Sequence, residues 1–169
     1  MDFLDIIYSR RSIRKYQEPQ ISEDDLKKIL KAGFQAPSAH NRQPWEFIVI
    51  TDNKIKETIA KIHPYAKMLP NAEYGIVVCG DKNKQTEMGF LVADCAAAIE
   101  NMLLATHSLN YGAVWCGLYP IEKLITFISK IFELPSNIIP IGLIALGTIG
   151  EEKAPRDNYD VNKIHFNKW

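Results

Sequence analysis

The feature that most restricts how this chain can fold is a long apolar stretch, GFLVADCAAAIENMLLATHSL, at residues 89–109. The stretch is long enough to cross a bilayer, but Asp94, Glu100 and Asn101 lie inside it, and charged groups are costly there. We therefore interpret residues 87–109 as a helix buried in a soluble protein. A helix that is apolar around most of its circumference must be covered on every side. In a chain of 169 residues, we expect a second subunit to supply part of that cover.

Apolar periodicity predicts the remaining helices and strands. Two near-continuous apolar runs, residues 45–51 and 74–80, are expected to form central strands of a sheet. The order of elements lacks a strict alternation of strand and helix, which favours an α+β fold over a doubly wound sheet. The length predicts a single domain, residues 1–169. The full prediction is helices over 2–9, 21–34, 87–109 and 121–132, strands over 45–51, 74–80 and 139–150, and a strand followed by a loop over 111–119.

The two ends of the chain carry different signals. The beginning, MDFLDIIYSRR, has acids before its apolar residues and is not typical of a signal peptide. The tail, residues 151–169, is polar and predicted to be a loop, but it closes with IHFNKW, which suggests docking onto a partner subunit. Three separated cysteines without a CxxC pair favour a reducing compartment, so a cytoplasmic location is expected.

Positive charge is concentrated in the segment RRSIRKY, residues 10–16, although the whole chain has 20 Lys plus Arg against 20 Asp plus Glu. The neutral balance argues against a general binder of nucleic acid or of an anionic membrane. A local anion is the simpler partner, because guanidinium groups bind phosphate oxygens in a bidentate way and Ser12 adds a hydroxyl donor. Charge alone leaves open a solvated basic loop, since exposed charge runs are common.

A second segment, APSAHNRQPWEF at residues 36–47, contains neutral polar groups between two prolines. Ser38, Asn41 and Gln43 offer donors and acceptors without a formal charge, which suits a neutral heterocycle or a polyol. Ordinary turn chemistry is the alternative, because serine, asparagine and proline are common in loops.

Other motifs limit the chemistry. Gly112 and Gly117 in YGAVWCGLYP would allow a flat ligand to approach the backbone, whereas Cys116 is better explained as a buried structural cysteine than as a nucleophile. The four histidines show no HxxxH or HExxH spacing, so no metal site is expected. Neither a GxGxxG turn nor a P-loop is present.

Taken together, these segments resemble the nitroreductase family of flavoproteins, in particular its short branch without a large lid insertion. The resemblance spans nearly the whole chain and rests on RRSIRKYQ, APSAHNRQPWEFIVI, KMLPNAEYGIVVCGD, VWCGLYP, IGLIALGTIGEEKAPR and HFNKW, in this order. It implies a central, mainly antiparallel sheet flanked by helices, and a homodimer with FMN at the interface. It also implies that the C-terminal segment is exchanged between the subunits.

The resemblance also implies roles for individual residues. Arg10 and Ser12 would bind the FMN phosphate, with Lys153 or Arg156 adding charge, and Arg14 would approach the N1/O2 edge of the ring. Many family members have a Glu–Gly pair where this chain has Cys116 and Gly117, which leaves the side-chain role of Cys116 open. The complete implied set is Arg10, Arg11, Ser12 and Arg14; Pro37, Ser38, Ala39, Asn41 and Gln43, from the second subunit; Lys67; Cys116, Gly117 and Leu118, near N5; and Lys153 and Arg156.

The implied activity is a ping-pong reaction in which NADH or NADPH reduces FMN and a nitroaromatic, quinone or other electron-poor acceptor then takes two electrons. The flavin would carry the chemistry, so no catalytic side chain is required. Alternatives within the family are dehalogenation, reduction of an activated alkene or fragmentation of flavin. Alternatives from other classes are a non-catalytic FMN-binding module and an anion-binding structural protein. Neither a nucleic acid nor a membrane is an expected partner.

Overall fold

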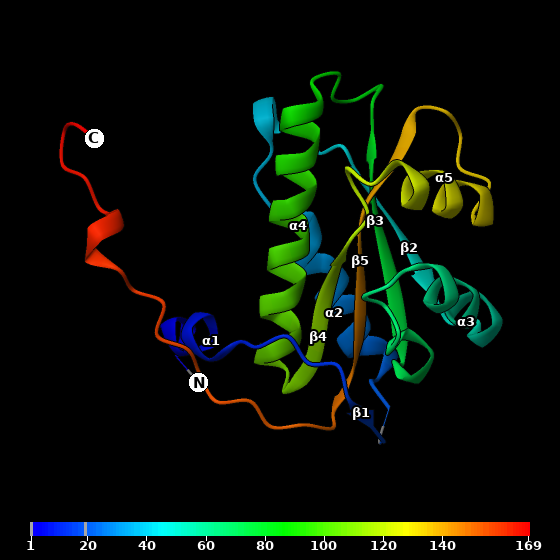
Figure 1. The fold of residues 1–169 in the computed structure, drawn as a ribbon, viewed down its shortest axis with the longest axis horizontal. Coiled ribbons are helices and arrows are strands. Elements are labelled where there is room, and N and C mark those ends of the chain that lie inside the picture. Colours follow the sequence, from blue (N-terminus) through cyan, green and yellow to red (C-terminus); the bar gives the residue numbers. More distant parts are fainter. Residues whose placement is uncertain (1, 19) are drawn as a thin grey trace.

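The computed structural model describes residues 2–18 and 20–169, and its centre is a five-stranded antiparallel sheet (Figure 1). β5 lies between β3 and β4, because residues 142–146 of β5 pair with both of these strands. β2 pairs with the other side of β3 and forms one edge of the sheet. All named strand pairs are antiparallel, which confirms the predicted α+β class. The strands are β1 (Tyr16–Gln17), β2 (Trp45–Ile50), β3 (Tyr74–Asp81), β4 (Tyr111–Gly117) and β5 (Ile138–Ile149).

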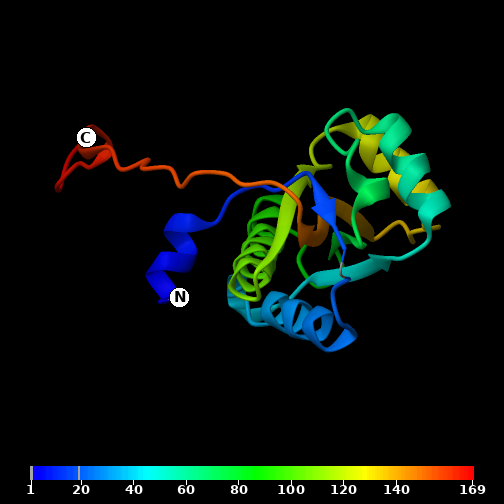
Figure 2. The same cartoon turned by 90° about the horizontal axis from the view of Figure 1, so that it is seen from below.

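Helices cover both faces of the sheet (Figures 1 and 2). α2 (Glu23–Phe34) and α4 (Met88–Ser108) lie on one face, and α3 (Asn53–Ile62) and α5 (Glu122–Ile131) lie on the other. α1 (Phe3–Ser9) stands apart from the sheet, beside the C-terminal end of α4. Short 3₁₀ turns occur at Ala39–Asn41, Leu69–Asn71 and Val161–Lys163.

The sheet separates two apolar layers, because successive side chains of a strand point to opposite faces. In β3, Ile76 and Val78 pack toward α2 and α4, whereas Val77 and Cys79 pack toward α3 and α5. All four side chains are fully buried, so β3 is a central strand, as predicted.

Three elements depart from the prediction: β1 and α3 were not predicted, and β2 differs in its position in the sheet. The strand predicted at residues 45–51 is β2, and it lies at the edge of the sheet, so the expectation of a central position is wrong. Its apolar run has another cause: helices cover both faces, with Phe47 packed against one layer and Ile48 against the other. Helix α3 was not predicted, although Asp52 caps its start by accepting hydrogen bonds from the first turn and Ile59 is fully buried.

Helix α4 is the predicted product of the long apolar stretch. Within the described ranges it is the one helix whose length and composition would allow it to cross a membrane, but it packs against the sheet and α2. Phe90 is half-exposed and Ala93 is exposed, so the chain by itself does not cover α4 on every side. Its buried residues are Leu91, Asp94, Cys95, Ala98, Ile99, Met102, Leu103 and Thr106.

Residues 10–15, called the arginine segment below, run along the outer edge of β4. Ser12 forms a parallel bridge with Ala113, and Ile13 N donates to Ala113 O at 3.0 Å. The side chain of Ile13 is buried over Gly112. The sheet edge thus fixes the course of the basic segment.

We predict that Gly112→Ala displaces the arginine segment and lowers the free energy of unfolding by about 1–3 kcal/mol, as overpacking does elsewhere. A Cβ at this position would lie 2.7 Å from Ile13 Cγ2 and 2.8 Å from Ile13 Cβ. Urea unfolding measures the effect. Gly89→Ala in α4 is the control, because its Cβ would meet nothing within 4 Å. Equal stability of the two variants would contradict the proposed contact.

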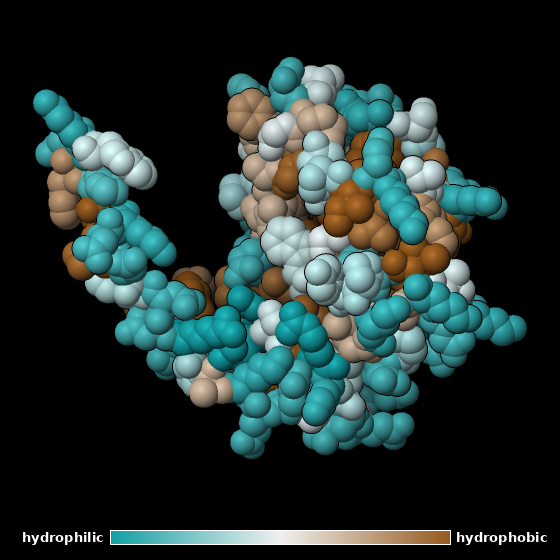
Figure 3. All heavy atoms as spheres, viewed as in Figure 1, coloured by the Kyte–Doolittle hydropathy of each residue, from teal (hydrophilic) through white to brown (hydrophobic). Residues whose placement is uncertain are grey.

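Residues 155–169, called the C-terminal arm, leave the body of the molecule (Figures 1 and 2). The space-filling view shows the end of this arm standing away from the rest of the surface (Figure 3). Phe166 is 85% exposed and Trp169 is 101% exposed, and Tyr159, Val161 and Ile164 are exposed as well. Exposed apolar side chains gathered on one segment are typical of sites of protein–protein contact.

Candidate functional site

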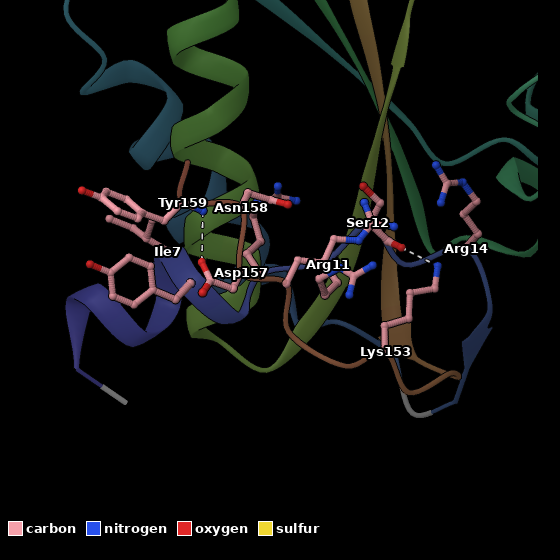
Figure 4. Close-up of a pocket in the computed structure, with 11 residues that line it drawn as sticks. Ile7, Arg11, Ser12, Arg14, Lys153, Asp157, Asn158 and Tyr159 are labelled. Atoms are coloured by element: carbon pink, nitrogen blue, oxygen red, sulfur yellow. Dashed lines mark hydrogen bonds between the residues drawn. The ribbon is translucent and has the colours of Figure 1, made fainter. Parts of the chain in front are cut away.

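The arginine segment and the beginning of the C-terminal arm line one pocket (Figure 4). Its volume is about 960 Å³, at the upper end of the range common for ligand sites, about 300–1,000 Å³. Its wall includes six of the residues predicted from sequence, namely Arg10, Arg11, Ser12, Arg14, Lys153 and Arg156. Five of these are cations, and among the lining residues Asp157 is the one acid, so the pocket favours an anionic ligand.

Glu151 and Lys153, just after β5, hold the arginine segment in place. Glu151 Oε1 accepts hydrogen bonds from Arg14 N at 2.5 Å and Lys15 N at 3.2 Å. Lys153 Nζ donates to Ser12 O at 2.6 Å and forms an ion pair with Glu151 at 3.1 Å. Arg11 Nη1 donates to the carbonyl oxygen of Ala154. The cationic side chains are therefore presented by a backbone that is fixed from the far end of the chain.

Sequence reasoning missed Glu151, because its partners lie 136 and 137 residues away. The hydrogen bond from the Arg14 backbone is the largest single influence on the pKa of the Glu151 carboxyl group, and it lowers this pKa. Together with Lys153 it outweighs the opposing effect of burial, so the pKa of Glu151 lies below its ordinary value of 4.5. A pKa that is lower in the folded state means that ionised Glu151 stabilises the fold above about pH 4.5 and ceases to do so as the pH falls.

We predict that Glu151→Gln lowers the free energy of unfolding at pH 7 by about 1 kcal/mol, the usual contribution of a hydrogen bond. The difference from the wild type should shrink as the pH falls below about 4.5, because the wild-type carboxylate is then protonated. Urea unfolding at a series of pH values measures this. Glu152→Gln removes the same charge from an exposed neighbour and serves as the control. A difference that stays constant with pH would argue against the role of Glu151.

Arg10 lies where the arginine segment meets α4. Its Nε is 3.5 Å from Glu100 Oε1, and both side chains are partly exposed, so this pair neutralises Arg10 only weakly. Ser9 Oγ lies 2.8 Å from His107 Nε2, and burial followed by the Arg10 charge lowers the pKa of His107. The lowered pKa means that His107 tends to stay neutral beside Arg10. Because Glu100 neutralises Arg10 only weakly, the Arg10 guanidinium remains able to bind an anion.

A second group of predicted residues lies at the end of β4. Cys116 and Leu118 are buried, so within one chain they leave a ligand almost no surface to contact. Burial raises the pKa of the Cys116 thiol to about 11, with the Arg14 charge acting weakly in the opposite direction, so the thiol is poorly suited to act as a nucleophile. Gly117, by contrast, is exposed, and a Cβ there would meet nothing within 4 Å. Lys67 Nζ donates to Ala60 O at 2.8 Å, at the end of α3.

Residues 37–43, called the proline loop, contain the remaining predicted residues. His40, Asn41 and Gln43 have positive φ angles of 53°, 53° and 47°, an arrangement that costs energy in residues other than glycine. The structure supports it with side chains: Ser38 Oγ accepts from Gln43 N at 2.9 Å, and Asp94 Oδ1 accepts from Ala39 N at 2.8 Å. Strained loops that are held in this way are common at binding sites.

Two supports of the proline loop were not predicted. Asp94 is 5% exposed, and Gln85, whose Oε1 accepts from Arg42 Nη1 at 2.8 Å, is fully buried. Within residues 2–18 and 20–169, Asp94 Oδ2 and Gln85 Nε2 are buried side-chain atoms without a hydrogen-bond partner. The sequence contained a signal for Asp94, since a carboxylate inside an apolar stretch needs a donor.

The proline loop and the arginine segment contact α4 at different points of its length. Ala39 binds Asp94 near the beginning of the helix, whereas Arg10 of the arginine segment pairs with Glu100 near its middle. With a rise of 1.5 Å per residue, these points are about 9 Å apart along the helix axis. The pocket lined by the arginine segment includes no residue of the proline loop, so one chain does not bring the two predicted halves into one pocket.

Comparison with known proteins identifies relatives over the whole chain. A family model described as Nitroreductase family matches residues 7–74 and 61–148. A protein of Methanothermobacter thermautotrophicus, named provisionally as an NADH dehydrogenase/NAD(P)H nitroreductase, is 43% identical over 169 residues, which is 100% of this chain and 88% of the relative. The crystal structure of a protein of the same provisional name from Parabacteroides distasonis has a TM-score of 0.95 at 39% identity, and the match covers 99% of this chain and 98% of that one.

Two similar solved structures have names that mention FMN. An FMN-dependent nitroreductase of Clostridium difficile has a TM-score of 0.90 at 28% identity, with 98% of this chain and 99% of that chain covered. A protein of Desulfovibrio desulfuricans, given provisionally as a nitroreductase and solved in complex with FMN, has a TM-score of 0.88 at 29% identity. That match covers 100% of this chain and 98% of that chain.

Proposed function

The chain belongs to the nitroreductase family, and we propose that it is an FMN-dependent oxidoreductase that uses NADH or NADPH to reduce nitroaromatics, quinones or similar electron-poor acceptors. The observation that carries the proposal is the pocket lined by five cations and one acid, which suits a phosphate-bearing cofactor. The named relatives support FMN as that cofactor and NAD(P)H as the electron donor.

The residues present fit FMN. We assign its phosphate to Arg10, Ser12 and Arg156, with Arg11 alongside. Lys153 is engaged with Ser12 O and Glu151, so its role is to hold the arginine segment, whereas Arg156 is exposed on the pocket wall. Arg14 belongs to the ring end of the site, because its charge acts on the Cys116 thiol beside Gly117. Lys67 belongs to the same end, because Tyr65, two residues before it, contacts Cys116.

The complete site requires two copies of the chain. The pocket lined by the arginine segment includes no residue of the proline loop, so we propose that Pro37, Ser38, Ala39, Asn41 and Gln43 act on the FMN held by the other subunit. The C-terminal arm would pack on the partner, which gives its exposed apolar side chains a surface to cover. In this arrangement each chain is a single FMN-binding unit, residues 1–169.

When bound, FMN would supply the two-electron chemistry, and the side chains would supply position and charge. Arg14 would stabilise the negative charge that reduced flavin carries at its N1/O2 edge. The ping-pong order follows if donor and acceptor use the same exposed flavin face in turn. Free, buried cysteines at positions 79, 95 and 116 agree with a cytoplasmic location.

Anaerobic stopped-flow spectroscopy of the FMN-loaded protein tests this proposal. We expect NADH or NADPH to bleach the flavin absorbance and a nitroaromatic or quinone to restore it. FMN that binds tightly but is bleached by neither nucleotide would indicate a non-catalytic FMN-binding module. A protein that fails to bind FMN would overturn the proposal as a whole.

A further inference from the structure

The backbone of Gly117 is directed to the open edge of β4. Leu118 N donates to Ile141 O at 3.2 Å, and Gly117 lies opposite Gly142 in the antiparallel register of β4 and β5. In such a pair, alternate residues turn their N–H and C=O groups toward the partner strand and away from it. Because Leu118 turns toward β5, Gly117 turns away from it. Gly117 is exposed and a Cβ on it would meet nothing within 4 Å, so a flat ligand can approach its backbone.

His63 binds the carbonyl group of this glycine. The imidazole is 2% exposed, and its Nε2 lies 2.9 Å from Gly117 O while its Nδ1 lies 3.2 Å from Tyr65 N. A carbonyl oxygen can only accept and a backbone N–H can only donate. These two partners therefore fix the tautomer: Nε2 carries the proton and donates to Gly117, and Nδ1 accepts from Tyr65.

Cys116 closes the hydrogen-bonded ring. Its Sγ donates to Tyr65 O at 3.2 Å, and because burial raises the pKa of the thiol to about 11, the proton stays on sulfur at neutral pH. His63 is itself anchored to α3, since its backbone N–H donates to Ile59 O at 2.8 Å. The chain thus clamps both sides of Gly117, a residue whose backbone would otherwise have the greatest freedom.

We propose that His63 is a positioning residue: through the Gly117 carbonyl group it aims the Gly117 N–H at N5 of the flavin. The inference rests on the proposed function, because it requires FMN in this site. Oxidised flavin can accept a hydrogen bond at N5, whereas reduced flavin carries a hydrogen there and cannot accept at that position. A well-aimed N–H therefore favours the oxidised form and lowers the reduction potential of bound FMN.

The test compares His63→Phe with His63→Gln in the full-length, FMN-loaded protein. Phenylalanine keeps a ring of similar size and removes both nitrogens, whereas glutamine retains an N–H donor near the position of Nε2. The midpoint potential is measured anaerobically against a reference dye. At metal sites, loss of a residue that orients a ligand typically changes affinity or activity by about 10- to 100-fold, and we expect an effect of the same scale here. A tenfold change in the relative affinity for the two redox states corresponds to about 30 mV for a two-electron couple.

We expect His63→Phe to raise the potential by about 30 mV or more and His63→Gln to restore most of the wild-type value. An unchanged potential in His63→Phe, or equal shifts in both variants, would overturn the inference and leave the proposed function intact. Failure of the wild-type protein to bind FMN would instead overturn the proposed function and this role with it.

A second measurement uses the FMN-free wild-type protein and needs no folded phenylalanine variant. Nitrogen-15 NMR of the histidine rings, assigned by the signals that disappear in His63→Gln, reports which ring nitrogen carries the proton. We expect a protonated Nε2 and an unprotonated Nδ1 for His63. The opposite tautomer, or a ring that exchanges rapidly between the two, would show that His63 does not clamp Gly117.

Discussion

Replacing Arg10 by alanine is expected to lower the affinity of the protein for FMN by about 10- to 150-fold. The guanidinium group lines the cation-rich pocket, and a hydrogen bond from a charged donor contributes about 1.5–3 kcal/mol. Each 1.4 kcal/mol corresponds to a factor of ten in the dissociation constant. Titration of the FMN-free protein with FMN, followed by flavin fluorescence, measures the change.

Two controls separate phosphate binding from other effects of removing Arg10. Lys28→Ala removes one positive charge from an exposed ion pair with Asp25 on α2, away from the pocket. Glu100→Gln breaks the 3.5 Å pair with Arg10 but leaves the guanidinium in place. We expect both variants to bind FMN as the wild type does. If Arg10→Ala bound FMN as tightly as these controls, the phosphate would have to lie elsewhere.

Deletion of residues 159–169 is expected to raise the dissociation constant of the dimer by at least about 100-fold. The deletion removes five exposed apolar side chains, and complete burial of one such side chain against a partner contributes about 1.5–3 kcal/mol. Burial of only two of them therefore accounts for about 3 kcal/mol, or about 100-fold in the dissociation constant. Sedimentation velocity over a range of concentrations measures the effect.

The body of the shortened chain should still unfold cooperatively, since the deleted residues are exposed or nearly so and Glu151 and Lys153 remain. Lys168→Ala changes the same arm without removing an apolar residue, and we expect it to leave the association unchanged. A shortened chain that associates as strongly as the full-length protein would refute the proposed role of the C-terminal arm.

Local patterns predicted most of the fold. The helix predicted over residues 87–109 differs from α4 by one residue at each end, because a long apolar stretch gives a clear signal for a buried helix. Helix α3 was missed although Ile55, Ile59 and Ile62 recur at helical spacing in the sequence. Its Lys56 is buried and donates to Ala72 O. Strand β1 has only two residues, too few for a period to be visible. The edge position of β2 depends on pairing between distant strands, which no local pattern encodes.

The cationic part of the candidate site was predictable from sequence, because clustered arginine and lysine side chains mainly bind anions. Arginine and lysine predicted an anion pocket, and the structure brings the arginine segment together with Lys153 and Arg156. The partners of the residues that hold the site were not predictable, because they are remote in sequence: Glu151 binds the Arg14 backbone, Asp94 binds Ala39, and His63 binds Gly117. An isolated acid or histidine has too many uses for sequence alone to select one.

The central claim is that two copies of this chain together hold FMN, and sedimentation velocity recorded at both the protein and the flavin absorbance bands tests it most directly. The account predicts a single species of twice the 19.2 kDa of one chain, with one FMN per chain, sedimenting as one boundary at both wavelengths. A species of 19.2 kDa that retains its FMN, or a dimer without flavin absorbance after addition of FMN, would contradict it.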